Sequence, residues 1–211
     1  MSQDLTNAIL AMDEDGALKI VKDRLDEGEA PEAVLDEARS AMTTLGEKFA
    51  CEEVFIPELI MGGEIMKGIA AELQPRIPAG ETAEKRGTVV VGTVHGDIHD
   101  IGKDVVVMML EVSGYDVHDL GIDVPVESFV AAIREKSPAV VGLSGLLTLA
   151  FDSMKDTIEG IAAAGLREQV KIMIGGSPVD EQICTYTGAD GWGRDATAAL
   201  TLAADWTGGA A

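Results

Sequence analysis

Short, nearly unbroken apolar runs in the second part of the chain constrain its fold more than any other feature. Residues 88–94 read Thr-Val-Val-Val-Gly-Thr-Val, and residues 139–143 read Ala-Val-Val-Gly-Leu. Strands that lack a polar alternation are buried on both faces, as in parallel sheets that helices cover on both sides. Amphipathic segments separate the runs, which indicates strands alternating with crossover helices. The strands expected on this basis are residues 88–94, 116–119, 139–143, 170–174 and 190–192.

The first 74 residues have a helical pattern instead. Apolar side chains recur at Val34, Ala38 and Met42, on one face of a segment that opens with Pro31. Proline suits the first turn of a helix, and a similar apolar face follows Pro57. Together with two shorter helical segments before residue 28, these predict a four-helix bundle, which short loops would make antiparallel.

A stretch with neither pattern separates the two regions. Residues 74–82 read Gln-Pro-Arg-Ile-Pro-Ala-Gly-Glu-Thr, a composition typical of a linker. The sequence therefore predicts a helical cap domain at 1–74, a linker at 75–87 and an α/β domain at 88–211. For the last of these we expect a doubly wound, five-stranded parallel sheet of the Rossmann-like or flavodoxin-like type.

Charge and composition exclude several classes of partner. The formal net charge of −21 disfavours nucleic acid, because phosphate backbones are bound by clustered Lys and Arg. No apolar stretch approaches the roughly 20 residues that cross a bilayer, so we expect no membrane association. The start Met-Ser-Gln-Asp lacks the features of a secretory signal, which predicts a cytoplasmic protein. Cys51 and Cys184 form no metal-ligand spacing, and both are expected to be reduced core thiols.

One histidine stands at the position where a doubly wound sheet binds its ligand. His99 follows the first strand and precedes a helix, with Asp97 two residues before it and Asp100 directly after it. A carboxylate at that distance can accept one ring N–H and leave the other nitrogen for a metal. A single histidine does not make a protein-only zinc site. From these residues alone, a solvated surface histidine and a phosphate site at the helix N-terminus remain open, although the two aspartates would repel a phosphate.

Three motif pieces together resemble the signature of cobalamin-binding domains. They are Asp97-x-His99-x-x-Gly102 after the first strand, Ser144-x-Leu146 after the third and Gly175-Gly176 after the fourth. The resemblance implies that His99 replaces the cofactor's own base on cobalt, with Asp97 adjusting its donation. It also implies that the displaced nucleotide tail enters a pocket in the sheet. Cofactor contacts are then expected from Gly96, Asp97, Ile98, His99, Asp100, Ile101, Gly102, Ser144, Leu146, Thr148, Gly175, Gly176, Gly193, Arg194 and Asp195.

The helical region is similar to the cap that precedes this domain in methionine synthase. By motif position, Phe49 and Ile56 match apolar residues that lie over the methyl group in that enzyme, although each equally suits an ordinary bundle core. One position departs from the pattern: Ala150 stands where the enzyme has a serine that completes a hydrogen-bonded relay from the histidine. We expect the relay to be shortened or rerouted, with Thr148 as the nearest hydroxyl that could replace the serine.

This two-domain arrangement looks like that of free-standing corrinoid proteins of methylamine, methanol, glycine betaine and methoxyaromatic methyltransferase systems. The resemblance implies a methyl carrier that is not catalytic alone. Its expected partners are a substrate-specific methyltransferase, a second methyltransferase that loads tetrahydrofolate or a thiol, and a reductive activase. The alternative is a cobalamin-dependent sensor, which would normally add a signalling or DNA-binding module. A mutase subunit and a flavin module of the same topology fit the residues less well.

Overall fold

The computed structural model describes residues 2–76 and 86–208, which divide into two compact units. Of the described residues, 2–76 form a helical unit, and the α/β unit lies within 86–208. Most of the predicted linker, residues 77–85, lies outside the described residues. No helix in the described part of the chain is long and apolar enough to cross a bilayer.

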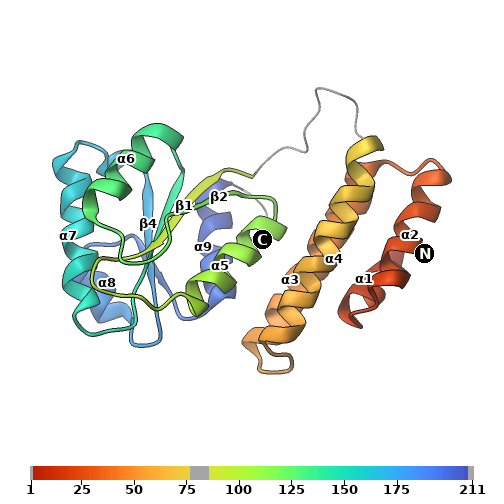
Figure 1. Cartoon of the computed structure of the whole chain (residues 1–211), viewed down its shortest axis with the longest axis horizontal. Helices are drawn as coiled ribbons and strands as arrows, with labels where there is room; N and C mark the ends of the chain where they lie inside the picture. The colour runs from red at the N-terminus through yellow and green to blue at the C-terminus, as the bar shows by residue number, and fades with distance from the viewer. Residues whose placement is uncertain (1, 77–85, 209–211) are drawn as a thin grey trace. The chain divides into compact units, whose positions relative to one another are not determined.

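Four helices form the helical unit, as the apolar pattern predicted. A short 3₁₀ turn follows them, and their bounds are α1 Ser2–Leu10, α2 Glu14–Asp26, α3 Pro31–Ala50, α4 Ile56–Leu73 and η1 Gln74–Arg76. Asp13 caps α2 by accepting the Gly16 N–H, and Pro31 opens α3. α3 and α4 lie side by side (Figure 1), and α1 packs against both α2 and α3. Cys51 at the end of α3 is exposed, so the prediction of a core thiol there was wrong; the loop that joins α3 to α4 carries it to the surface.

The α/β unit contains a five-stranded, all-parallel sheet, which confirms the predicted fold class. Its strands are β1 Thr88–Thr93, β2 Asp116–Asp119, β3 Val140–Ser144, β4 Lys171–Gly175 and β5 Gly191–Gly193. Its helices are α5 Ile101–Val112, α6 Val126–Lys136, α7 Ala150–Ala163, α8 Glu181–Thr187 and α9 Ala196–Thr207, with a 3₁₀ turn η2 at Arg167–Gln169.

The strand order β2-β1-β3-β4-β5 is that of a flavodoxin-like sheet. Figure 1 shows α6, α7 and α8 on one face and α5 and α9 on the other. The order in which successive strands are added to the sheet therefore changes direction between β1 and β3. In doubly wound sheets this switch point, at the carboxyl ends of the two strands, is where ligands bind.

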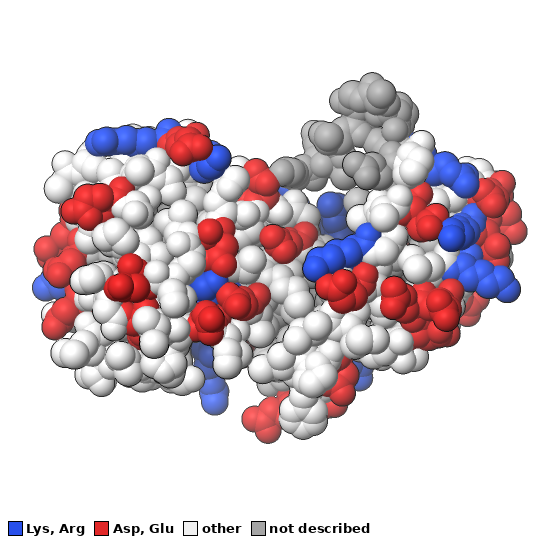
Figure 2. All heavy atoms as spheres, in the orientation of Figure 1, with Lys and Arg blue, Asp and Glu red and all other residues white. Residues whose placement is uncertain are grey.

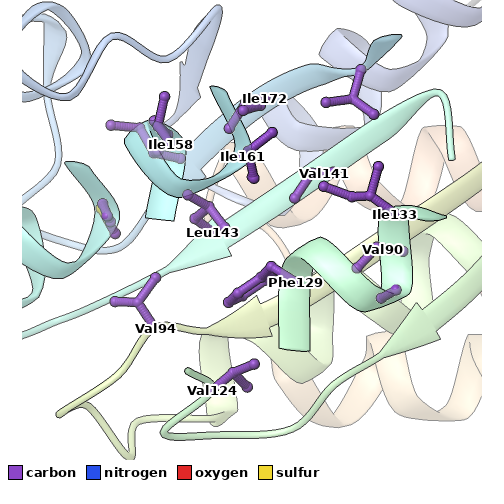
Figure 3. Close-up of a cluster of buried hydrophobic side chains, with 14 of the residues drawn as sticks. Val90, Val94, Val124, Phe129, Ile133, Val141, Leu143, Ile158, Ile161 and Ile172 are labelled. Atoms are coloured by element: carbon purple, nitrogen blue, oxygen red, sulfur yellow. The ribbon is translucent and has the colours of Figure 1, made fainter. Parts of the chain in front are cut away.

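A buried apolar cluster fastens α6 and α7 to the sheet. Phe129 lies at its centre, fully buried beside Val90, Val141 and Leu143 (Figure 3). The β1 backbone comes so close that a Cβ added at Gly92 would stand 2.9 Å from the Phe129 ring. This packing fixes the strand from which the candidate site departs.

Replacing Phe129 with Ala should lower the free energy of unfolding by about 3–5 kcal/mol, because the ring fills the core and its removal leaves a cavity. Denaturant unfolding followed by circular dichroism measures the loss. Phe55→Ala is the matched control, since Phe55 is 64% exposed and its removal should change stability by no more than ~0.5 kcal/mol. Equal losses in the two variants would contradict this account of the core.

Candidate functional site

The three motif pieces meet along one row at the carboxyl edge of the sheet. The strand register pairs Thr93 with Ser144, Ser144 with Gly175, and Gly175 with Gly193. The loops that leave this row carry the rest of the predicted residues: Gly96 to Asp100 between β1 and α5, Leu146 and Thr148 between β3 and α7, Gly176 after β4, and Arg194 and Asp195 after β5. Ile101 and Gly102 begin α5.

Asp97 joins the first two loops. Its side chain is fully buried, and its Oδ1 lies 2.7 Å from His99 Nδ1 and accepts the His99 backbone N–H at 2.9 Å. The Oδ2 accepts the backbone N–H groups of Leu146 and Leu147, at 2.7 Å and 2.9 Å. One carboxylate therefore orients the imidazole and ties the histidine loop to the loop after β3.

This environment sets the charge of Asp97. Burial alone would raise the pKa of its carboxyl group, but the N–H groups of Leu147, His99 and Leu146 and the His99 ring outweigh burial and hold the pKa well below its ordinary value. Asp97 is thus an ionised acceptor at neutral pH. An ionised acceptor fixes the tautomer of His99 with the proton on Nδ1, which directs the lone pair of Nε2 outward.

The side chain of His99 is 48% exposed, so Nε2 can be reached from outside. Its backbone is also anchored, because Thr93, a buried strand residue, donates its hydroxyl to the His99 carbonyl oxygen at 3.0 Å. His99 is consequently held at both its backbone and its ring, while one ring nitrogen faces outward. Such a side chain suits a single axial ligand of a metal that brings its other ligands with it.

Exposed large apolar side chains lie near His99 in sequence and in the loop after β3 that Asp97 contacts. Ile98 and Ile101 are 67% and 68% exposed, and Leu146, Leu147 and Leu149 are 38%, 43% and 78% exposed. We call these five residues the apolar rim. Four of them lie in the two loops that Asp97 joins, and Ile101 begins α5 directly after the first of these loops. Exposed apolar groups gathered at a ligand-binding edge fit a flat, largely apolar ligand such as a corrin ring.

Two glycines of the motifs differ in whether the fold itself requires glycine. Gly176 has a φ of +142°, and a Cβ there would overlap the Gly145 carbonyl oxygen, so the protein itself requires glycine. Gly102 differs: a Cβ at this position would meet nothing within 4 Å, although it lies in the first turn of α5. Nothing in the described chain demands glycine there, which fits a ligand that approaches the helix backbone closely.

The donors to Asp97 bear on the expected shortened or rerouted relay. Among the described residues, they are the His99 ring and the backbone N–H groups of His99, Leu146 and Leu147, and the Thr148 hydroxyl is not one of them. Ala150 is buried in the core cluster at the start of α7. A shortened or rerouted relay stays a prediction.

Several predicted residues have contacts that serve the fold. Asp195 caps α9 by accepting the Ala198 N–H at 2.9 Å, and Arg194 is exposed. Phe49 is half-buried in α3 and Ile56 is 38% exposed at the start of α4. The cofactor and cap roles of these four residues stay predictions. The sequence analysis missed Thr93 and Leu147, and only the run Gly-Leu-Leu-Thr-Leu, which is apolar where a surface loop is expected, could have indicated the latter.

Asp97→Asn should destabilise the corrinoid-free protein by about 2–3 kcal/mol at pH 7, because an amide group places a donor against the N–H groups that now face a carboxylate. The depressed pKa sets the pH dependence: the stabilisation is complete above the ordinary Asp pKa of about 4 and is lost as the pH falls toward the folded-state pKa. The difference between wild type and variant should therefore shrink below about pH 4 in urea unfolding. Asp100→Asn is the control, because Asp100 is an exposed aspartate near Asp97. A stability difference between wild type and Asp97→Asn that stays constant with pH would contradict the role assigned to the Asp97 carboxylate.

Comparison with known proteins supports a corrinoid site. The B12 binding domain family matches residues 87–201, and a second B12 binding domain family matches residues 1–74. The dimethylamine corrinoid protein of Methanosarcina barkeri is 34% identical over 201 residues, which cover 95% of this chain and 94% of the relative. The trimethylamine corrinoid protein 2 of Methanosarcina mazei is 36% identical over 196 residues, covering 92% and 90% of the two chains.

Two solved structures are similar to this chain over almost its whole length. A novel cobalamin-binding protein from Desulfitobacterium hafniense matches with a TM-score of 0.84 and 37% identity, covering 98% of both chains. A chain of the methanol:cobalamin methyltransferase complex from Methanosarcina barkeri matches with a TM-score of 0.83 and 25% identity, covering 98% of this chain and 79% of that one. The predicted corrinoid cofactor is thereby confirmed, and the chain belongs to the B12-binding family of corrinoid proteins.

Proposed function

We propose that this chain is a corrinoid methyl carrier in which Nε2 of His99 binds cobalt as an axial ligand. The observation that carries the proposal is the buried Asp97 carboxylate, 2.7 Å from His99 Nδ1, which leaves one ring nitrogen for a metal. When bound, the cofactor supplies a cobalt centre that accepts and releases a methyl group. His99 would contribute one ligand to the cobalt, and the other ligands would come from the cofactor itself.

The remaining residues act on the cofactor by contact. In this proposal the apolar rim packs against the ring and excludes water, and Gly102 lets the backbone of α5 approach it. The row of Ser144, Gly175 and Gly193 offers a small hydroxyl group and bare backbone at neighbouring strand ends. That chemistry suits the nucleotide tail, which the new axial ligand displaces.

In this proposal, partner enzymes bind the methyl donor and the methyl acceptor. The relatives named for dimethylamine and trimethylamine, and the solved methanol:cobalamin methyltransferase complex, support a substrate-specific methyltransferase as the first partner. A methylated amine is the donor class to test first. A second methyltransferase, which passes the methyl group to tetrahydrofolate or a thiol, and a reductive activase complete the proposed cycle.

We assign residues 1–74 the role of a cap domain and residues 75–87 that of a linker. The support for a cap is the exposed apolar stretch just before and within the start of α4, where Phe55, Ile60 and Met61 are 64%, 50% and 42% exposed. Together with Ile56 and the half-buried Phe49, such side chains offer a methyl group a water-free cover.

Replacing His99 with Ala should abolish the histidine-ligated state of the loaded protein. In the Co(II) form, electron paramagnetic resonance detects the nuclear spin of the axial nitrogen, so labelling the protein's histidines with nitrogen-15 should change the splitting in wild type. The variant should show no label-dependent splitting. His118→Ala is the control, because His118 is a partly exposed histidine beside Asp116 on β2. Wild-type splitting that ignores the label would refute the ligand assignment.

Gly102→Ala should separate stability from binding. The added methyl group meets no protein atom, and alanine is the better helix former, so the corrinoid-free protein should gain up to about 1 kcal/mol. Corrinoid affinity should fall, because the same methyl group would occupy space that the ring needs. Thermal unfolding and equilibrium titration with hydroxocobalamin measure the two effects, and unchanged affinity would show that no ligand lies against this turn.

A further inference from the structure

We infer that Asp123, in the loop between β2 and α6, is a positioning residue that holds the histidine loop in its cobalt-binding conformation; the inference rests on the proposed function. Asp123 is remote from the motif in sequence but lies beside it in the fold. Its Oδ1 accepts the Gly96 backbone N–H at 2.7 Å, and its own backbone N–H donates to the Asp97 carbonyl oxygen at 3.0 Å. Gly96 and Asp97, the two residues that precede Ile98 and His99, are therefore both hydrogen-bonded to Asp123.

Asp123 is one of four described residues other than glycine that have a positive φ. Its φ is +50°, in the left-handed region that favours glycine. A side chain kept at such a position needs a reason, and here the carboxylate supplies one by binding the Gly96 N–H. Gly96 is itself in the left-handed region, with a φ of +81°. The Gly96 N–H is the largest influence on the Asp123 carboxyl group; against the opposing effect of burial, it and the contact with His95 keep the pKa of Asp123 below its ordinary value.

The segment that carries Asp123 is fixed to the sheet. Thr93 donates its backbone N–H to the Gly121 carbonyl oxygen at 2.9 Å, and Val124 donates to the Thr93 carbonyl oxygen at 2.9 Å. Val94 and Val124 also form a parallel bridge. Residues on both sides of Asp123 are thus bonded to the end of β1, which makes Asp123 a fixed point beside the loop that contains Gly96.

Asp97 is consequently held from two directions. The N–H groups of Leu146 and Leu147 hold its side chain, and Asp123 holds its backbone. His95 extends the same contact, with its Nδ1 2.7 Å from the Asp123 carboxylate. Loss of the Asp123 carboxylate would free the Gly96 peptide to turn toward solvent. The Asp97 backbone and the His99 ring would then lose a defined position relative to the ring of the cofactor.

Three substitutions distinguish the hydrogen bond from backbone strain. Asp123→Asn keeps an acceptor oxygen and tolerates the left-handed conformation, Asp123→Gly removes the acceptor but relieves the strain, and Asp123→Ala removes the acceptor and keeps the strain. The full-length variants are titrated with hydroxocobalamin, and the histidine-ligated fraction of the Co(II) form is measured with nitrogen-15 histidine. Asp116→Asn, which changes another aspartate that pairs with a histidine on β2, is the matched control.

Gly and Ala at position 123 should each lower corrinoid affinity by about tenfold, the lower end of the range for residues that orient a metal ligand, and should reduce the histidine-ligated fraction. Asn should stay near wild type in both measurements. Wild-type affinity and ligation in Asp123→Gly, or a loss in Asp123→Asn as large as in Asp123→Gly, would overturn the inference. A wild-type protein without the histidine-dependent splitting would instead refute the proposed function, so the two failures are distinguishable.

Discussion

The buried carboxylate of Asp97 is the interaction on which the candidate site depends. It accepts N–H groups from its own loop and from the loop after β3, which start from neighbouring strands. A buried carboxylate without donors would be very costly, so its burial compels both loops to present their N–H groups to it. The histidine ring is one of those donors. The requirement to satisfy one charge thus determines the direction of the imidazole and the shape of the switch point together.

The sheet and the motif row were predictable because both depend on local patterns. The apolar run at 88–94 located β1 to within one residue, and the same holds for the ends of β3 and β4. Parallel strands whose loops leave one edge then bring Ser144 and Gly175 to the level of Thr93, the last residue of β1. The carboxyl ends of parallel strands lie at one edge of a sheet, so motif pieces far apart in sequence could be expected to meet.

The contacts that complete the site were not predictable in the same way. The donors of Leu146 and Leu147 are backbone groups, which every residue except proline possesses, and no side-chain pattern marks them. The contact of Asp123 with Gly96 depends on a left-handed turn in another loop, and Asp123 could equally have been a simple turn residue. Ala150 shows the converse: the sequence shows that a hydroxyl is missing at this position, but it does not show that backbone N–H groups donate to Asp97. A backbone amide orients a carboxylate without offering it a proton to exchange, so Asp97 here acts by orientation and charge.

The apolar rim and Gly102 share a physical logic that links the corrinoid-free fold to its ligand. Five exposed isoleucine and leucine side chains forgo the free energy that burial would give, and a glycine in a helix that could accept alanine lowers the stability of the protein alone. Covering the rim returns part of that free energy as binding free energy, since apolar area leaves water only when the ligand is present. A ligand that binds the folded chain alone also stabilises it in proportion to the logarithm of its concentration over its dissociation constant. The site therefore gains affinity from the same residues that weaken the corrinoid-free fold, while Asp97, Thr93 and the segment around Asp123 keep the histidine in place before the ligand arrives.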